Sequence, residues 1–277
     1  MAFNDNAVFT ASTGYVYTAP VGTAAPTPKQ LKYFDPETFG AQTYTLKVTG
    51  SNPYTLTVGS NTTTELKAEA SPAEIQSALE KLAAVGTGGA VVSGTSAKEG
   101  VAVSFVGDNF GKELELKGGS GAGVTLLSKA SGWEPIGHTN NDDLPEFGYD
   151  GGDSETRGSW QKKVLKTITT ETPVDYVTIK ALQFDTDTLE YYYGKNASKV
   201  DNIFGVDTAN ASDVERAVLI VLKDGIFSIA FSAAKAGLRR DESISLESDD
   251  FATLPLRATF VKHPGRHLFE WTLPEGA

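Results

Sequence analysis

Apolar and polar residues alternate along several short stretches of this 277-residue chain, the pattern of β-strands that bury one face. A continuous apolar run at 218–222 is typical of a strand covered on both faces, and Asp224-Gly225 after it favours a tight hairpin turn. In the returning stretch, 227–231, large side chains alternate with Ser and Ala, so we expect one face in a core and the other small and solvated. The stretch 174–184 also favours a strand over a helix.

Turn residues between alternating stretches predict two further hairpins: 43–49 with 54–58 around Asn52-Pro53, and 256–262 with 267–273 across Pro264-Gly265. Four more short strands, separated by glycines, are expected at 90–92, 101–106, 113–116 and 124–127. The chain is therefore predicted to be mainly β.

Two helices interrupt the strands. Ser71, Pro72 and Glu74 together predict a helix start, because Ser can cap the free N–H groups, Pro fits the first helical position and Glu completes a capping box. The buried stripe of this helix is predicted to be Ile75, Ala78, Leu79 and Leu82, and Gly86 to stop it.

The second helix is predicted over 187–193. Asp187 and Glu190 would form its capping box, and Gly194 would end it. We expect one face of this helix to carry Leu189, Tyr192 and Tyr193.

Composition divides the chain into parts. The 90 residues 41–130 contain 13 of the 28 glycines, none of the six arginines and only four of the 27 aromatic residues. Their net charge is −1, so the flanks carry −10 of the total of −11. We interpret 41–130 as a small α+β domain inserted into a discontinuous host domain made of 1–40 and 131–277.

The charge and the missing cysteines exclude several classes of protein. With 24 Lys and Arg against 35 Asp and Glu, the surface has little means of gripping nucleic acid, whose affinity comes mainly from displaced counterions. No cysteine is available for disulfides, thiol nucleophiles or cysteine metal sites. Neither a signal-peptide pattern nor an apolar run long enough for a membrane span is seen, so we expect a soluble protein made in the cytosol, with no membrane partner.

No catalytic or cofactor motif emerges. His263 and His267 have a spacing seen in pairs of metal ligands, but the Pro264-Gly265 between them indicates a turn. The third histidine, His138, is distant in the sequence, so no third histidine ligand lies nearby. Neither a Gly-x-Ser-x-Gly elbow, a phosphate loop nor a His-Glu-x-x-His motif occurs. We therefore expect no enzyme activity, no cofactor and no metal.

The segment between His138 and Trp160 is unusually acidic, and we expect it to be a long loop without regular structure. Its register does not match a calcium loop, and a glycosidase pair of carboxylates would sit on more rigid elements. A solvated loop and a cation site stay open, but long loops usually have a binding role, so contact with a partner is favoured. The candidate contact residues are Asp142, Asp143, Glu146, Asp150, Asp153, Glu155 and Arg157.

The order of several motifs resembles the major tail tube proteins of long-tailed phages that infect actinobacteria. These motifs are NDNAV at 4–8, TGYVYTAPVGT at 13–23, WEPIGHT at 133–139, YDGGD at 149–153 and GSWQ at 158–161, and the likeness continues through 181–194. AEIQSALEKL at 73–82 resembles a small α+β module found in virion proteins of the same phages.

The resemblance implies a tail-tube fold, in which packed antiparallel sheets form a β-barrel or sandwich with a flanking helix. It also implies hexameric rings that stack head-to-tail into a hollow tube, together with tape measure, terminator and distal tail proteins. The acidic loop is then the candidate contact between rings, and the N-terminal residues 3–28 are a second. The acidity would let DNA pass without sticking, the insert would project outward and touch host-surface polymers, and the virion would be assembled in the host cytoplasm.

Two other classes of protein are compatible with the same composition and strand pattern. A secreted carbohydrate-binding adhesin would also be β-rich and rich in Thr and Gly, although we see no signal peptide. Another virion component, such as a capsid decoration or tail terminator protein, is the second alternative. Tubes seen by negative-stain microscopy of the purified protein would distinguish the tail tube interpretation from these two alternatives.

Overall fold

The computed structural model describes residues 8–32, 34–208, 213–225, 227–246 and 250–274. The chain forms two compact units, one made of the chain up to Ala25 with Pro135–Leu273 and the other of Pro26–Glu134. The sequence placed these boundaries at 40/41 and 130/131, so the second unit takes in a longer part of the chain than the composition shift marks. Residues 3–7 of the second predicted contact segment lie outside the described residues.

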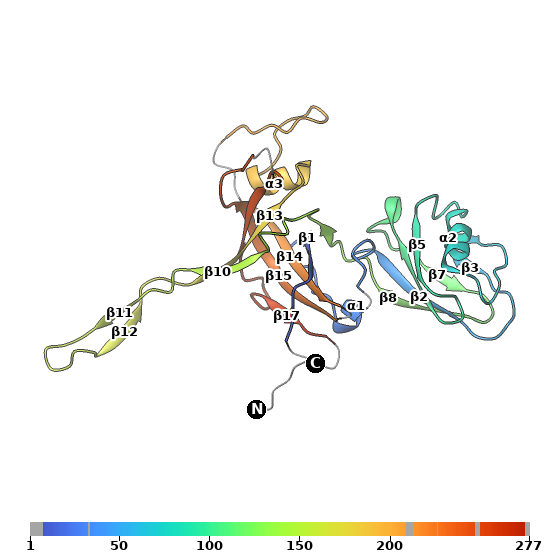
Figure 1. Ribbon diagram of the computed structural model, residues 1–277, viewed down its shortest axis with the longest axis horizontal. Helices are drawn as coiled ribbons and strands as arrows, with labels where there is room; N and C mark the ends of the chain where they lie inside the picture. Colours follow the sequence, from blue (N-terminus) through green and yellow to red (C-terminus); the bar gives the residue numbers. More distant parts are fainter. Residues whose placement is uncertain (1–7, 33, 209–212, 226, 247–249, 275–277) are drawn as a thin grey trace. The chain divides into compact units, whose positions relative to one another are not determined.

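The first unit is built on one antiparallel sheet (Figure 1). Its order is β10-β13-β16-β15-β14-β1-β9, and β17 pairs with β15 beside β16. The strands are β1 (Thr13–Ala19), β9 (Glu134–Pro135), β10 (Glu146–Asp150), β13 (Val174–Ala181), β14 (Val214–Asp224), β15 (Phe227–Arg240), β16 (Leu254–Phe260) and β17 (Glu270–Thr272). A separate two-stranded ribbon, β11 (Ser154–Arg157) with β12 (Lys166–Thr169), continues from β10 and β13.

Helix α3 (Thr186–Tyr193) packs against β15 and β16. Its helical face buries Tyr191 and Tyr192, and the Tyr191 hydroxyl forms a 2.8 Å hydrogen bond with Thr18 Oγ1 of β1. The predicted cap was wrong, because Asp185 is the N-cap and forms the capping box with Thr188. The predicted end is confirmed, since Gly194 is the C-cap with a left-handed φ of 88°.

The hairpin of β14 and β15 is confirmed, with Asp224 opposite Phe227. The expected faces of its second strand were wrong, because Ser228, Ala230 and Ser232 are buried while Phe227 is half-exposed. Both faces of the middle of β15 are covered, so small side chains there allow close packing.

The second predicted hairpin was also wrong. Although Arg266 N–H donates to His263 O and Gly265 has a φ of 73°, so that the chain does turn, β16 and β17 do not pair with each other. β16 pairs with Ala236–Arg240 and β17 with Ala230–Ser232, so both lie along β15.

The second unit contains a four-stranded sheet, β5-β6-β2-β8, and a three-stranded sheet, β4-β3-β7. Its elements are α1 (Pro28–Lys32), β2 (Gln42–Val48), β3 (Leu56–Val58), β4 (Asn61–Thr62), α2 (Pro72–Glu80), β5 (Ala90–Gly94), β6 (Val101–Phe105), η2 (Gly107–Asn109), β7 (Leu116–Gly118) and β8 (Ala122–Ser128). The predicted pairing of 43–49 with 54–58 was wrong, because β2 and β3 belong to different sheets.

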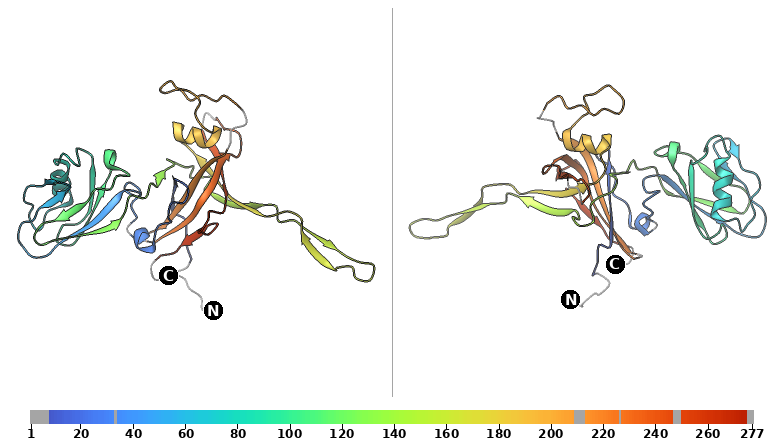
Figure 2. Two further views of the ribbon diagram at one scale, coloured as in Figure 1. Left: turned by 180° about the vertical axis from the view of Figure 1, so that it is seen from behind. Right: turned by 45° about the horizontal axis from the view of Figure 1, so that its top comes forward.

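Helix α2 starts as the sequence predicted. Ser71 accepts a hydrogen bond from Glu74 N–H, the Glu74 carboxylate accepts from Ser71 N–H at 2.8 Å, and the predicted apolar stripe is buried. The helix faces β5 on one side of the unit (Figure 2). Together, the two units confirm a mainly β protein with antiparallel sheets and few helices. No helix in the described part of the chain is long and apolar enough to cross a membrane.

Candidate functional site

The acidic segment, residues 142–155, is not the irregular loop that we expected. Glu146 and Asp150 are the first and last residues of β10, Glu155 lies in β11, and Arg157 ends that strand. Asp142 and Asp143 precede β10, and Asp153 precedes β11. In β11, where all four residues are exposed, polar sequence can form a strand because pairing with β12 satisfies its backbone without burying a face.

The ribbon beyond the sheet, residues 151–173, is called the arm. In the sheet just before the arm, β10 pairs with β13, from Glu146 opposite Thr178 to Asp150 opposite Val174. Within the arm, β11 pairs with β12, from Ser154 opposite Thr169 to Arg157 opposite Lys166. From Asp150 to Ser154 the chain advances four residues, while from Thr169 to Val174 it advances five. The extra residue on the second side forms a β-bulge at the base of the arm.

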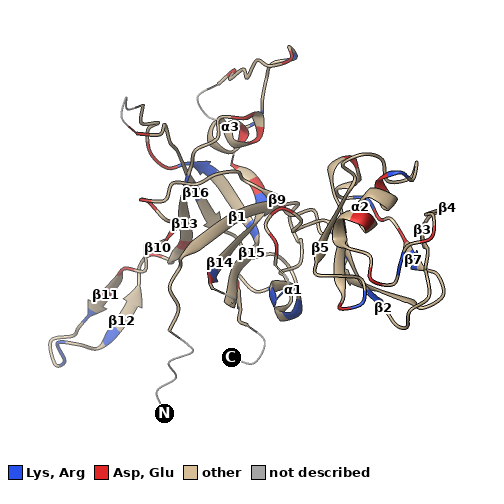
Figure 3. Ribbon diagram, turned by 45° about the vertical axis from the view of Figure 1, so that its right-hand side comes forward, with Lys and Arg blue, Asp and Glu red and all other residues tan. Residues whose placement is uncertain are grey.

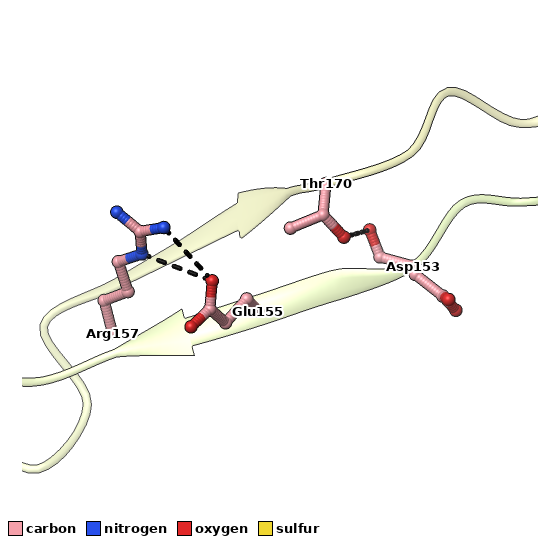
Figure 4. A network of polar contacts seen from close by, with 4 residues as sticks. All are labelled: Asp153, Glu155, Arg157 and Thr170. Atoms are coloured by element: carbon pink, nitrogen blue, oxygen red, sulfur yellow. Dashed lines mark hydrogen bonds and ion pairs between the residues drawn. The ribbon is translucent and has the colours of Figure 1, made fainter.

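Two glycines make this bulge possible. Gly151 and Gly152 have φ values of 76° and 82°, which residues with a side chain rarely adopt. Thr170 closes the bulge, because its hydroxyl donates to Asp153 O at 3.0 Å (Figure 4). The Thr170 N–H donates to the same oxygen at 2.8 Å. The arm is thus continuous with the sheet and is not a separate loop.

Three ion pairs hold the acidic segment. Asp143 Oδ2 accepts from Lys180 Nζ at 2.9 Å, and this hydrogen bond raises the pKa of Lys180. Glu155 Oε2 accepts from both Nε and Nη2 of Arg157 (Figure 4). The third pair joins Asp150 to Arg257 of β16.

Arg257 is the centre of a small cluster at the base of the arm. Its guanidinium lies 3.4 Å from the ring centroid of Tyr176, and Nη1 is 3.8 Å from Asp241 Oδ1. Tyr176 lies directly opposite Gly148 in the sheet, and a Cβ atom at Gly148 would come within 2.6 Å of the ring. The glycine therefore leaves room for the tyrosine that Arg257 covers.

The arm tip, residues 157–166, has the opposite charge. It carries Arg157, Lys162, Lys163 and Lys166 and no acidic residue, and Figure 3 shows the basic residues gathered there. Trp160 at the turn is 99% exposed. Of the tip residues only Arg157 was predicted to make contact, because the prediction was based on the acidic run, which ends there.

A half-exposed aromatic cluster lies beside the base of the arm. Phe147 of β10 packs edge-on against the buried Phe231, with 4.6 Å between ring centroids, and it also contacts Trp271 of β17. Phe269 contacts Phe231 as well. Phe147, Phe231 and Trp271 come from three separate strands and Phe269 directly precedes β17, so no local pattern in the sequence could group them.

The site has the groups for binding another macromolecule through charge and apolar contact. Among the described residues, no three His, Asp or Glu side chains lie close enough together to hold a metal ion. The carboxylates of the acidic segment lie instead along β10, β11 and the residues beside these strands.

Comparison with known proteins places the chain in a recognised group. A family model described as phage tail tube protein matches residues 1–78 and 121–276. The major tail protein Gp23 of Mycobacterium phage D29 is 36% identical over 271 residues, which cover 98% of this chain and 93% of that protein. Gp23 of Mycobacterium phage L5 is also 36% identical, over 274 residues, with the same coverage. A solved structure from Mycobacterium phage Patience aligns with 36% of this chain and 50% of its own, at 16% identity and a TM-score of 0.28, too low to support any argument.

Proposed function

Because the chain belongs to the phage tail tube protein family and is a structural protein of the virion, we propose that it polymerises as stacked hexameric rings into the tube through which the genome is delivered. Residues 1–40 and 131–277 would form the tube domain. The observation that carries the proposal is the sheet of the first unit, which ends at β10 and β9 and extends into the arm.

The ends of the sheet support lateral assembly. Strands at the end of a sheet offer unpaired backbone groups, and closing several sheets into a ring removes those edges. In a hexamer, β10 of one subunit would lie towards the β9 side of its neighbour. This arrangement gives each subunit two different surfaces in the ring.

The arm supports contact between rings. It leaves the sheet beside β10, and the acidic segment with Arg157 lies along it. Contact between unlike surfaces does not close on itself, so repeated stacking yields a filament. The N-terminal residues 3–28 remain the second candidate for this contact.

The net charge of −11 fits a tube that conducts DNA. Carboxylates within about one Debye length, roughly 8–10 Å, repel phosphates, so DNA would slide along a wall that does not bind it. A lumen lined mainly by Lys and Arg would contradict this part of the proposal.

The inserted module, residues 41–130, would project outward, because a folded domain inside the tube would block the lumen. Its near-neutral charge is compatible with an exterior position and with weak contact with host-surface polymers. Tape measure, terminator and distal tail proteins would be the other partners, and assembly would take place in the host cytoplasm.

Electron microscopy of the purified protein tests the proposal with two deletion variants. In the first, residues 151–173 are replaced by Asn-Gly, which can join Asp150 and Val174 because the two face each other in the sheet. We expect this variant to remain folded but to form no tubes. In the second, a short linker replaces 41–130, whose flanking residues are close, since Ser131 N–H donates to Gly40 O at 3.0 Å.

We expect the second variant to form tubes. Loss of tubes would show that the module is needed for assembly, while tubes from the first variant would show that the arm makes no essential contact. A wild-type protein that stays monomeric and binds glycans would favour the adhesin alternative.

A further inference from the structure

The arm tip differs in charge from the rest of the protein. The chain's net charge of −11 includes the four positive charges of residues 157–166, so the remainder carries −15. Arg157 is paired with Glu155, but within the described part of the chain Lys162, Lys163 and Lys166 form no ion pair. Three unpaired cations therefore project from an acidic protein at one place.

The tip is also a built turn that presents a large apolar side chain. Ser159 N–H donates to Lys162 O at 2.7 Å and Lys162 N–H donates back to Ser159 O at 3.1 Å, so Trp160 occupies the middle of the turn. Leu165 N–H donates to Arg157 O, which fixes the turn to the end of β11. Val164 and Leu165 of the tip are also exposed. Trp is one of the residues that most often dominate the binding energy of protein interfaces, so an exposed Trp in this turn is a candidate interface residue.

The complementary charges lie at the base of the same arm. Asp142, Glu146 and Asp153 are exposed, and none of them takes part in an ion pair in the regions that the structure describes. At about 3.3 Å per residue in a strand, the ribbon from Asp150 to Arg157 places the tip roughly 20 Å beyond the end of β10. The tip lysines therefore cannot reach Asp142 and Glu146 of their own chain.

We infer that the arm tip of one copy docks onto the acidic segment, residues 142–155, of a second copy. Lys162, Lys163 and Lys166 pair there with the carboxylates, and Trp160 is buried in the contact. The inference rests on the proposed function, in which the arm joins successive rings, and it names the two surfaces that meet. Because tip and base are different surfaces of one chain, each copy uses both, and the contact repeats without closing.

Zero-length cross-linking tests which groups meet. A carbodiimide activates a carboxylate, and a lysine amine in direct contact with it then forms an amide while the carbodiimide leaves as a urea. Tubes are assembled from an equal mixture of ¹⁴N and ¹⁵N protein, so mass spectrometry separates links between chains from links within one chain. We expect mixed-isotope links from Lys162, Lys163 or Lys166 to Asp142, Glu146 or Asp153. Links from these lysines only to acidic residues outside 142–155 would overturn the inference.

Charge exchange tests whether the pairing drives assembly. We expect Lys162→Glu, Lys163→Glu and Lys166→Glu together to raise the concentration needed for tube formation at least tenfold. Asp142→Lys, Glu146→Lys and Asp153→Lys together should do the same, and the six substitutions combined should restore assembly. The matched control reverses three exposed lysines of the second unit, Lys47, Lys81 and Lys112, with the same change in net charge. We expect this control to assemble like the wild type.

Trp160 provides a test that does not depend on charge. We expect Trp160→Ala to raise the assembly concentration about tenfold and Trp160→Phe to raise it less, because Phe keeps much of the apolar surface. Equal assembly of wild type, Trp160→Ala and the triple Lys→Glu variant would overturn the inference. If the variant lacking 151–173 fails to assemble while these tip variants assemble normally, the inference alone fails. If that deletion variant assembles too, the proposed role of the arm fails with it.

A basic tip with an exposed Trp could instead hold DNA, and the same variants decide this. Binding of a fluorescent duplex to unassembled subunits is measured at physiological salt. We expect no binding that the triple Lys→Glu substitution removes. Duplex binding that depends on these lysines, together with unchanged tube formation, would overturn docking between copies.

Discussion

Removal of Arg257 should loosen the base of the arm, mainly through loss of its contact with Tyr176. Arg257→Leu keeps much of the apolar stem but removes the guanidinium that joins β16 to Tyr176 of β13 and Asp150 of β10. Asp150→Asn and Tyr176→Leu each remove one of these partners. Together with the two double variants, they form two thermodynamic cycles.

The structure sets the relative size of the two couplings. Asp150 is 60% exposed, so its ion pair with Arg257 should contribute about 0.5 kcal/mol. The Arg257 side chain is only 15% exposed and lies 3.4 Å from the Tyr176 ring centroid, so a cation–π contribution of about 1–2 kcal/mol is expected. We therefore expect the Arg257–Tyr176 coupling to be at least twice the Arg257–Asp150 coupling.

Hydrogen exchange measured by mass spectrometry resolves this effect at β10. A loss of about 2 kcal/mol in Arg257→Leu would make the β10 amides exchange roughly 30-fold faster when closing outruns exchange, since 1.4 kcal/mol is about tenfold. Peptides from β5 and β6 in the other compact unit serve as the internal control and should not change. Unassembled subunits are used so that contacts between copies do not contribute.

Salt gives an independent check on the same cycles. At about 1 M ionic strength the Debye length falls to about 3 Å, so the coupling of Arg257 to the exposed Asp150 should decline. The Tyr176 coupling should decline less because the guanidinium is largely buried. An Asp150 coupling larger than the Tyr176 coupling at both salt concentrations would refute this account of the arm base.

Three further changes have expected outcomes. Tyr54→Phe should leave stability unchanged or raise it, as measured by urea unfolding, because the buried Tyr54 hydroxyl has no hydrogen-bond partner in the described part of the chain. Ser71→Ala should cost the second unit about 1 kcal/mol by the same assay. Hydrogen bonds from the Ser71 N–H and, second, its hydroxyl lower the pKa of Glu74 from 4.5, so the stabilisation by Glu74 is complete above that pH and is lost as the pH falls through the lower value. In acid unfolding curves the wild type should show this loss, Ser71→Ala a smaller one because its N–H still donates, and Glu74→Gln none. Gly148→Ala should cost about 1–3 kcal/mol at the arm base and speed β10 exchange, because the new Cβ would displace Tyr176 from Arg257.

Local signals in the sequence predicted the elements that depend on neighbouring residues. The start of α2 and the hairpin of β14 and β15 are examples, because a capping box and an Asp-Gly turn act within a few residues. The pairings of β2, β3, β16 and β17 were predicted wrongly. β2 pairs with β6 and β8, β3 with the adjacent β4 and the distant β7, and both β16 and β17 with β15. Alternation specifies a buried face without specifying the neighbouring strand.

The candidate site was predicted in part. Its acidic residues were identified from composition, but the expected loop is an ordered ribbon. The arm has no buried face, so its strands carry no hydrophobic alternation; all four residues of β11 are exposed. Arg257 and Tyr176 were missed for a different reason, because only the pairing of β13 with β16 brings them together.

The arm's lack of a buried face also bears on its purpose. An isolated two-stranded ribbon is at best marginally stable in water, yet this one carries Trp160, Val164 and Leu165 on its surface. All three side chains are exposed, so their burial would require a second layer over the arm. The docking inferred above would supply this layer from another copy, whose acidic remainder is complementary to the basic tip. Because the arm has no core, its strands show no hydrophobic alternation and could not be predicted from the sequence. The lack of a core also suits the arm to a contact that forms only on assembly.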